Sequence, residues 1–330
     1  MPFLERVTAG GRVPPERLSA VAEEYRRGGG RSPLNDLNRQ LLAALRAELD
    51  RRGLGAGLYW GNLHAAPFLG EALHRAHSEG IRRLVVLTTS AYSSDSGCGR
   101  YRRALHDALA EVNSGSRPHG DLGADVVRPW FNHPAHVEQC VELLVGTFPA
   151  DPDPDRVRVL FVTHSIPEEM NDRSGPAGNA YVAQHRDVAA TVADLAGRDL
   201  GIRVGWDLVY CSRSGRPEDA WLEPDIRDHL RRLDPRVRQV VVAPIGFTAD
   251  HWEVLSDLDL RARQTAYDQG LDFRRVPTVG SGPVLVRGLV DLLTERAALA
   301  RGEDPDRPAL GRLGPAPAIC PEGCCQEAVS

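Results

Sequence analysis

The chain has 330 residues and a formal net charge of −5, and its basic side chains are all arginines. This length is enough for two domains of ordinary size, and the composition is typical of a soluble globular protein. The slight negative charge argues against a nucleic-acid partner, because nucleic-acid binding needs a basic surface. No run of apolar residues is long enough to span a bilayer, and no signal peptide is recognisable. We therefore expect a cytoplasmic protein without an integral membrane segment.

The first half of the chain alternates helical and strand patterns. We expect helices at 16–26, 35–52, 67–78, 100–112 and 134–147, and strands at 57–61, 83–90 and 125–130. No strand pattern precedes the first helix, so we interpret the first domain as truncated at its start, with its first strand missing.

The second half repeats this alternation after a run of Asp and Pro residues at 151–155 that is typical of a linker. We expect strands at 157–163, 205–211, 237–244 and 273–279, and helices at 180–196, 225–232, 249–266 and 283–301. Alternating strands and helices with short connections predict parallel sheets flanked by helices. The predicted fold is α/β with two Rossmann-like domains, at 1–150 and 151–303, followed by a cysteine-containing tail at 304–330.

The strand expected at 157–163 is followed directly by His164. Ligands of open α/β folds bind at the carboxyl ends of parallel strands, so His164 lies where chemistry is expected. Position alone favours a simpler interpretation, in which a strand-end histidine is hydrogen-bonded to a neighbouring loop.

The helix expected at 249–266 carries acidic residues at spacings i, i+3 and i+7, namely Asp250, Glu253 and Asp257. This spacing places all three on one helical face, directed toward the end of the strand before His164. Acids near a helix N-terminus complement the helix dipole, which explains Asp250 well and Glu253 in part but does not explain Asp257. Such a carboxylate stripe beside a histidine suits a divalent cation that is passed along and loses its water.

The loop at 90–94 offers hydroxyl groups, and Arg100 lies at the start of the helix beyond it. Together these groups suit a ligand that bears carboxylates. Without other information, a solvated loop and an ordinary helix start are the favoured interpretation.

Three cysteines crowd into the tail, namely Cys320, Cys324 and Cys325. Their spacing in a chain expected to be cytosolic indicates a metal or an iron–sulfur cluster, which needs a further ligand. Cys140 is the candidate, but it also belongs to an apolar helical stripe at 137–144, so the pattern favours a buried core residue. Cys98 and Cys211 have no neighbouring cysteine in the sequence, and we interpret both as structural.

Five segments, spread over nearly the whole chain, form an ordered set. They are Gly-Gly-Gly-Arg-Ser-Pro-Leu at 28–34, Ser-Ala-Tyr-Ser at 90–93, Thr-His-Ser-Ile-Pro at 163–167, Trp-Leu-Glu-Pro-Asp at 221–225, and 244–259, which begins Pro-Ile-Gly-Phe. In this order they resemble the motifs of ferrochelatase, the lyase that inserts ferrous iron into a porphyrin. The resemblance implies the same two-domain α/β fold.

The resemblance implies that His164 is the active-site histidine and Glu253 the active-site glutamate, with Asp257 further along the path of the metal. A neutral imidazole can accept a porphyrin proton near pH 7, and carboxylates hold a divalent ion without trapping it. Fe²⁺ is then a substrate. Side chains expected to bind the porphyrin are Tyr92, Ser93, Arg31 and Arg100.

The resemblance also implies a [2Fe–2S] cluster with a structural or sensing role, bound by Cys140, Cys320, Cys324 and Cys325. This reverses the preference for Cys140 as a core residue. The Ser-Ala-Tyr-Ser-Ser sequence and the cysteine tail resemble a bacterial branch of the family, so we favour coproporphyrin III over protoporphyrin IX.

The family usually opens with a strand and a glycine-rich turn before the segment at 2–4, and both are absent here. Of the arginines usual around 9–12, only Arg12 remains, with Arg6 nearby. Two alternatives stay open: a chelatase for another metal and tetrapyrrole, and a non-catalytic porphyrin-binding, heme-binding or iron–sulfur sensing protein.

Overall fold

The computed structural model describes residues 29–115, 120–216 and 218–325, together with 6, 22–23 and 25–26. Most of the helix predicted at 16–26 therefore lies outside the described residues. The segments at 2–4 and 9–12 also lie outside them; of the residues before 22, only Arg6 is described. The missing first strand therefore stays a prediction. None of the described helices combines the length and apolar character that crossing a bilayer needs. The cytoplasmic location stays a prediction.

The second half of the chain forms a parallel four-stranded sheet with the order β4-β3-β5-β6. Its strands are β3 (Val157–His164), β4 (Trp206–Cys211), β5 (Gln239–Ala243) and β6 (Asp272–Arg275). The four strands predicted here are confirmed. Because β3 pairs with β4 on one edge and β5 on the other, it occupies an interior position in the sheet.

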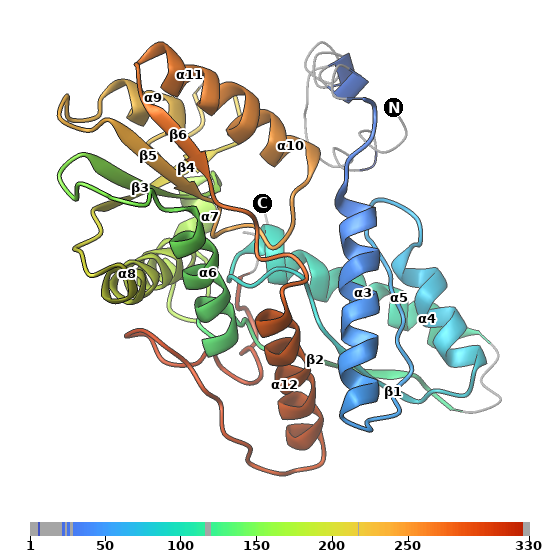
Figure 1. The fold of residues 1–330 in the computed structure, drawn as a ribbon. Helices are drawn as coiled ribbons and strands as arrows, with labels where there is room; N and C mark the ends of the chain where they lie inside the picture. Colours follow the sequence, from blue (N-terminus) through green and yellow to red (C-terminus); the bar gives the residue numbers. More distant parts are fainter. Residues whose placement is uncertain are drawn as a thin grey trace.

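Helices cover both faces of this sheet (Figure 1). Side chains of alternate residues point to opposite faces of a strand. Val159 and Phe161 of β3 accordingly pack in the cluster that includes α6 (Pro134–Thr147) and α8 (Ala180–Leu200). Leu160 and Val162 pack toward α9 (Ile226–Arg231) and the 252–268 helices. Burial on both faces explains the continuous apolar run of β3.

The first half contributes a smaller parallel pair, β1 (Arg83–Val86) and β2 (Gly123–Val126), to the described structure. Its helices are α3 (Leu34–Arg51), α4 (Leu69–Ser78) and α5 (Arg100–Ser114). The strand predicted at 57–61 is wrong, because this segment joins neither described sheet. Leu58, Tyr59 and Trp60 have side chains typical of a strand, but they are only partly buried and no described strand lies beside them to pair with.

The helix predicted at 249–266 is divided into three parts. α10 (Trp252–Val254) is followed by the π-helical segment η2 (Leu255–Ala262) and by α11 (Arg263–Asp268). Two further short elements were not predicted, namely η1 (Asp95–Gly99) and α7 (Glu168–Asp172). A π-helical stretch shifts the direction of the side chains that follow it, so the simple i, i+3, i+7 rule does not hold along this segment.

The last long helix, α12 (Pro283–Ala300), packs against α3 and α6 (Figure 1). Two ion pairs fix it to the first half: Arg128 Nε to Glu295 Oε1 at 2.8 Å, and Arg296 Nη2 to Asp125 Oδ1 at 2.5 Å. α6 in turn packs against α8 of the second half. The domain boundaries near 150 and 303 stay predictions, and the packing of α6 and α12 crosses the boundary near 150.

The substitution Gly288→Ala tests the contact between α12 and α6. A Cβ at Gly288 would lie 2.3 Å from the Ala135 Cβ and 2.9 Å from His133 Nδ1. We expect the overpacking to lower the free energy of unfolding by about 1–3 kcal/mol. Gly146→Ala in α6 is the control, since a Cβ there meets no atom within 4 Å, and it should change stability by less than about 1 kcal/mol, in the stabilising direction. Urea denaturation measures both, and equal midpoints for the two variants would contradict the close packing.

Candidate active site

His164 is the last residue of β3, and two hydrogen bonds fix its position. The His164 Nδ1 lies 2.5 Å from the Ser165 carbonyl oxygen, and the Tyr181 hydroxyl donates to the His164 carbonyl oxygen at 2.9 Å. Because a carbonyl oxygen only accepts, Nδ1 carries the proton in this contact. The second ring nitrogen, Nε2, is therefore the one that can accept a proton.

Glu253 lies opposite that nitrogen, with its Oε2 3.7 Å from His164 Nε2. The side chains of His164 and Glu253 are 32% and 45% exposed, so an incoming ligand can reach both. His164 comes from the end of β3, and Glu253 comes from α10, which follows β5. The structure thus brings together the two residues predicted as the central pair, from positions 89 apart in the sequence.

The pair changes the pKa of each partner. Burial disfavours the charged imidazole of His164, but the Glu253 carboxylate and the Ser165 carbonyl outweigh it, and the pKa of His164 is raised. Burial alone would raise the pKa of Glu253, but its contacts with His164 and nearby cations outweigh burial and lower it. The pair therefore favours the state in which the imidazole is charged and the carboxylate ionised.

His251 is a second histidine at this site, two residues before Glu253. Burial lowers the pKa of His251, and the charge of His164 lowers it further. Its ring packs edge-on against Phe247 with the centroids 5.6 Å apart. No role was predicted for His251 from the sequence, although it lies only two residues before Glu253. The site therefore holds one histidine that favours the charged form and one that favours the neutral form.

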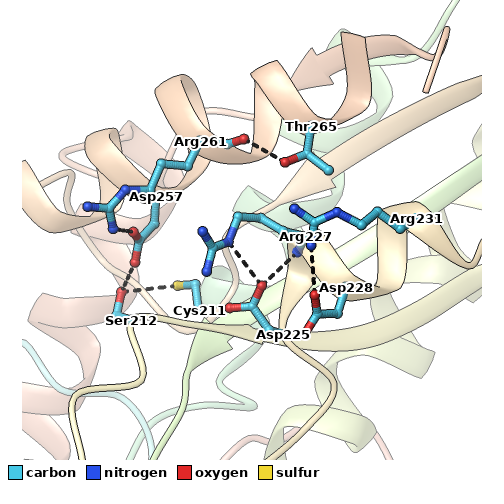
Figure 2. Close-up of polar contacts among 9 residues, drawn as sticks. All are labelled: Cys211, Ser212, Asp225, Arg227, Asp228, Arg231, Asp257, Arg261 and Thr265. Carbon is cyan, nitrogen blue, oxygen red and sulfur yellow. Dashed lines mark hydrogen bonds and ion pairs between the residues drawn. The ribbon is translucent and has the colours of Figure 1, made fainter. Parts of the chain in front are cut away.

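Asp257 is buried and held by two neighbours (Figure 2). The Ser212 hydroxyl donates to its Oδ2 at 2.6 Å, and Arg261 Nη1 donates to its Oδ1 at 2.8 Å. Ser212 follows the end of β4 and adopts a left-handed backbone conformation with φ 62°, which is costly for a residue other than glycine. Ser212 was not predicted here, because only the fold places the end of β4 beside η2. Arg261 was not predicted either, although it follows Asp257 by four residues and its pairing is a local helical signal.

Asp250 does not lie on a common helical face with Glu253 and Asp257. It precedes the first turn of α10 and accepts a hydrogen bond from Arg275 Nη2 at 2.6 Å. The same guanidinium lies 3.7 Å from Asp259. The interpretation of a single acidic stripe is therefore wrong for Asp250. Of the two acids predicted along the metal path, Glu253 is the open one and Asp257 the enclosed one.

The residues predicted to bind the porphyrin have different surroundings in the structure. Tyr92 is buried and stacks on His185 with ring centroids 3.6 Å apart, while the backbone N–H of Ser93 donates to the Gln184 side chain at 2.8 Å. Both therefore pack against α8. Arg31 is exposed and pairs with Asp36 at 3.0 Å, and Arg100 is the partly exposed first residue of α5. Their roles in substrate binding stay predictions.

The tail cysteines meet Cys98 and do not meet Cys140. Cys98, Cys324 and Cys325 form one buried cluster with Cys320 packed against it. Cys140 belongs to the main core, and its Sγ lies 3.8 Å from His136 Nε2. The apolar stripe of α6 packs inward with Cys140 on it, which is the interpretation that the helical pattern favoured by itself. Cys98 lies in the short element η1, and no cysteine spacing in the sequence reveals it.

Within the described ranges, no group of three or more His, Cys, Asp or Glu side chains stands in an arrangement that could hold a metal ion as it is. This applies to the His164–Glu253 pair as well as to the cysteines.

The substitution Glu253→Gln tests the electrostatic coupling of the pair. Loss of the carboxylate should lower the pKa of His164, measured by NMR titration of its imidazole, while Glu138→Gln on the exposed side of α6 should leave it unchanged. Because the folded-state pKa of His164 is raised, the pair stabilises the fold at low pH and loses that effect as pH rises through this pKa. The stability difference between wild type and Glu253→Gln should therefore be larger at pH 6 than at pH 9. An unshifted His164 titration would show that the two side chains are not coupled.

Comparison with known proteins adds to this geometry. The family model described as Ferrochelatase matches residues 1–297. The coproporphyrin III ferrochelatases of Streptomyces griseus and Streptomyces coelicolor are 45% and 46% identical to this chain, over 98% of it and 88% of each relative. The ferrochelatase of Rhodopirellula baltica is 38% identical over the same shares. Among solved structures, the sirohydrochlorin chelatase SirB of Bacillus subtilis subspecies spizizenii aligns with a TM-score of 0.48 and 13% identity, over 79% of this chain and 90% of that one.

The sequence matches extend over both halves of the chain and include the segments that carry His164 and Glu253. This chain belongs to the ferrochelatase family.

Proposed function

We propose that this protein inserts Fe²⁺ into coproporphyrin III during heme biosynthesis, a metal insertion of the lyase class. The observation that carries the proposal is the His164–Glu253 pair, open to solvent at the carboxyl edge of a parallel sheet. The names of the Streptomyces relatives support coproporphyrin III as the porphyrin.

Insertion of a divalent metal into a porphyrin releases two protons from pyrrole nitrogens, and a base near the macrocycle can accept them in turn. His164 Nε2 is suited to this role because Nδ1 already carries the ring proton. Glu253 faces Nε2 and stabilises the imidazolium that forms. Its second oxygen can contact Fe²⁺ as a hard ligand that does not trap the ion. The histidine is active in its neutral form, so the rate should fall as pH drops through the raised pKa of His164.

The nearby His251 favours one further candidate, a chelatase for another divalent metal, because imidazole ligands also suit cobalt and nickel. Insertion assays with Co²⁺ and Ni²⁺ beside Fe²⁺ separate the two candidates.

The substitution His164→Ala should lower the rate of Fe²⁺ insertion by about 10²–10⁴-fold, the usual effect of losing a general base. Binding of coproporphyrin III should remain, because only one contact is lost. Anaerobic insertion followed by absorbance measures the rate, and porphyrin fluorescence measures binding. His74→Ala, on the exposed side of α4, is the matched control and should insert iron at the wild-type rate. If His164→Ala turned over like wild type, the assignment of the base would be wrong. If wild type bound the porphyrin without turnover, the non-catalytic alternative would replace the proposed activity.

The substitution Arg261→Met tests whether Asp257 lies on the path of the metal. It removes the guanidinium that pairs with Asp257 and leaves the carboxylate more negative toward an approaching cation. The apparent KM for Fe²⁺ should fall several-fold while kcat changes little. Arg263→Met, which removes the exposed partner of Asp259, is the control and should have the smaller effect. Equal KM values for the two variants would place Asp257 off the path.

A further inference from the structure

The tail after α12 is an ordered strap that crosses back over the second half (Figure 1). The Asn132 side chain donates to the Gly314 carbonyl oxygen at 2.6 Å, at the start of α6. The Asp187 carboxylate of α8 accepts a hydrogen bond from the Arg312 backbone N–H at 2.8 Å. These contacts hold the tail between the end of α12 and η1. The last described residues pack beside η1.

Two sulfur–sulfur distances among the tail cysteines and Cys98 of η1 match those across a shared metal, although the four cysteines do not stand as a complete metal site. Cys98 Sγ and Cys325 Sγ are 3.9 Å apart, and Cys324 Sγ and Cys325 Sγ are 3.8 Å apart. Two thiolates bound at about 2.3 Å to one tetrahedral metal ion have sulfur atoms about 3.8 Å apart. All of these cysteines are unpaired as disulfides. Cys320 is the most exposed of the four.

The backbone around these sulfurs also suits a thiolate group. The Gly175 N–H donates to Cys325 Sγ at 2.9 Å, and backbone hydrogen bonds of this kind stabilise metal-bound thiolates. A Cβ at Gly99 would lie 2.8 Å from the Cys325 carbonyl oxygen, so the residue after Cys98 must be glycine for the tail to approach this closely. Arg102, on the next turn, adds positive charge near Cys320.

Cys140 has none of these features. It lies in the core among side chains of α8 and the sheet, including Phe161 and Val192. No tail cysteine belongs to that core cluster. A cluster bound through Cys140 would require the tail to leave η1 and displace packed apolar side chains.

We propose that the [2Fe–2S] cluster implied by the family resemblance is bound here through Cys98 in place of Cys140, with Cys320, Cys324 and Cys325. Four thiolates complete the usual ligand set of such a cluster. The cluster would join η1 of the first half to the end of the tail. It plays no part in the proton transfers at His164, so this inference does not rest on the proposed insertion reaction.

The test compares anaerobically purified wild type with Cys98→Ser, Cys140→Ser and Cys211→Ser. The last is a control, since Cys211 is buried at the end of β4. Iron and acid-labile sulfide per chain, visible absorption, and electron paramagnetic resonance of the reduced protein report the cluster. Cys98→Ser should reduce iron and sulfide to background, while Cys140→Ser and Cys211→Ser should keep wild-type content. His164→Ala should also keep the cluster, which separates this inference from the proposed activity.

A second measurement on wild type guards against a Cys98→Ser variant that fails to fold. Alkylation followed by mass spectrometry should find Cys98 protected in the loaded protein and reactive after the iron is removed by a chelator, with Cys140 unchanged. Loss of the cluster in Cys140→Ser but not in Cys98→Ser would overturn the assignment. Zinc in place of iron and sulfide in wild type, or no bound metal, would overturn it as well.

Discussion

The close contact between the end of β3 and the turn that follows β5 is the constraint on which the site depends. A Cβ at Gly246 would lie 2.1 Å from the Thr163 hydroxyl oxygen, so only glycine permits this approach. The Thr163 hydroxyl is itself fixed between Tyr181 at 2.7 Å and His185 at 2.9 Å. Because both segments are fixed, the side chain of His164 at the end of β3 lies opposite the side chain of Glu253, which follows the turn after β5. The same turn reaches the first half, where Thr248 donates to the Thr89 carbonyl oxygen.

The carboxylates near this contact differ in the type of side chain that they pair with. Asp257, Asp259 and Asp250 all have arginine partners, whereas Glu253 has only a histidine within ion-pair distance among the described residues. An arginine is always charged and holds a carboxylate as a structural partner, whereas a histidine can give up its charge near neutral pH. Glu253 is therefore the carboxylate whose partner can change state during a proton transfer. This difference gives two acids on one segment separate roles without any difference in residue type.

The two halves are joined by more than a linker. α12 returns to the first half through buried ion pairs, α6 packs on the second half, and the tail crosses α6 and α8 before it ends beside η1. A buried pair such as Arg128–Glu295 gains little net stability, but breaking one partner is costly, so it favours one arrangement of the helix over others. The relative position of the halves is thus fixed by segments distant in sequence.

The sequence by itself determined the local elements and the central residues. Apolar runs and caps located the strands of the second half and helices such as α6 and α12 to within a few residues, because those signals act between near neighbours. The motifs likewise singled out His164 and Glu253. The tertiary structure alone decided that Cys98 meets the tail, that Ser212 holds Asp257, and that 57–61 forms no described strand. These outcomes depend on contacts between segments far apart in the chain, and the periodicity of a single segment carries no information about which distant surface it will meet.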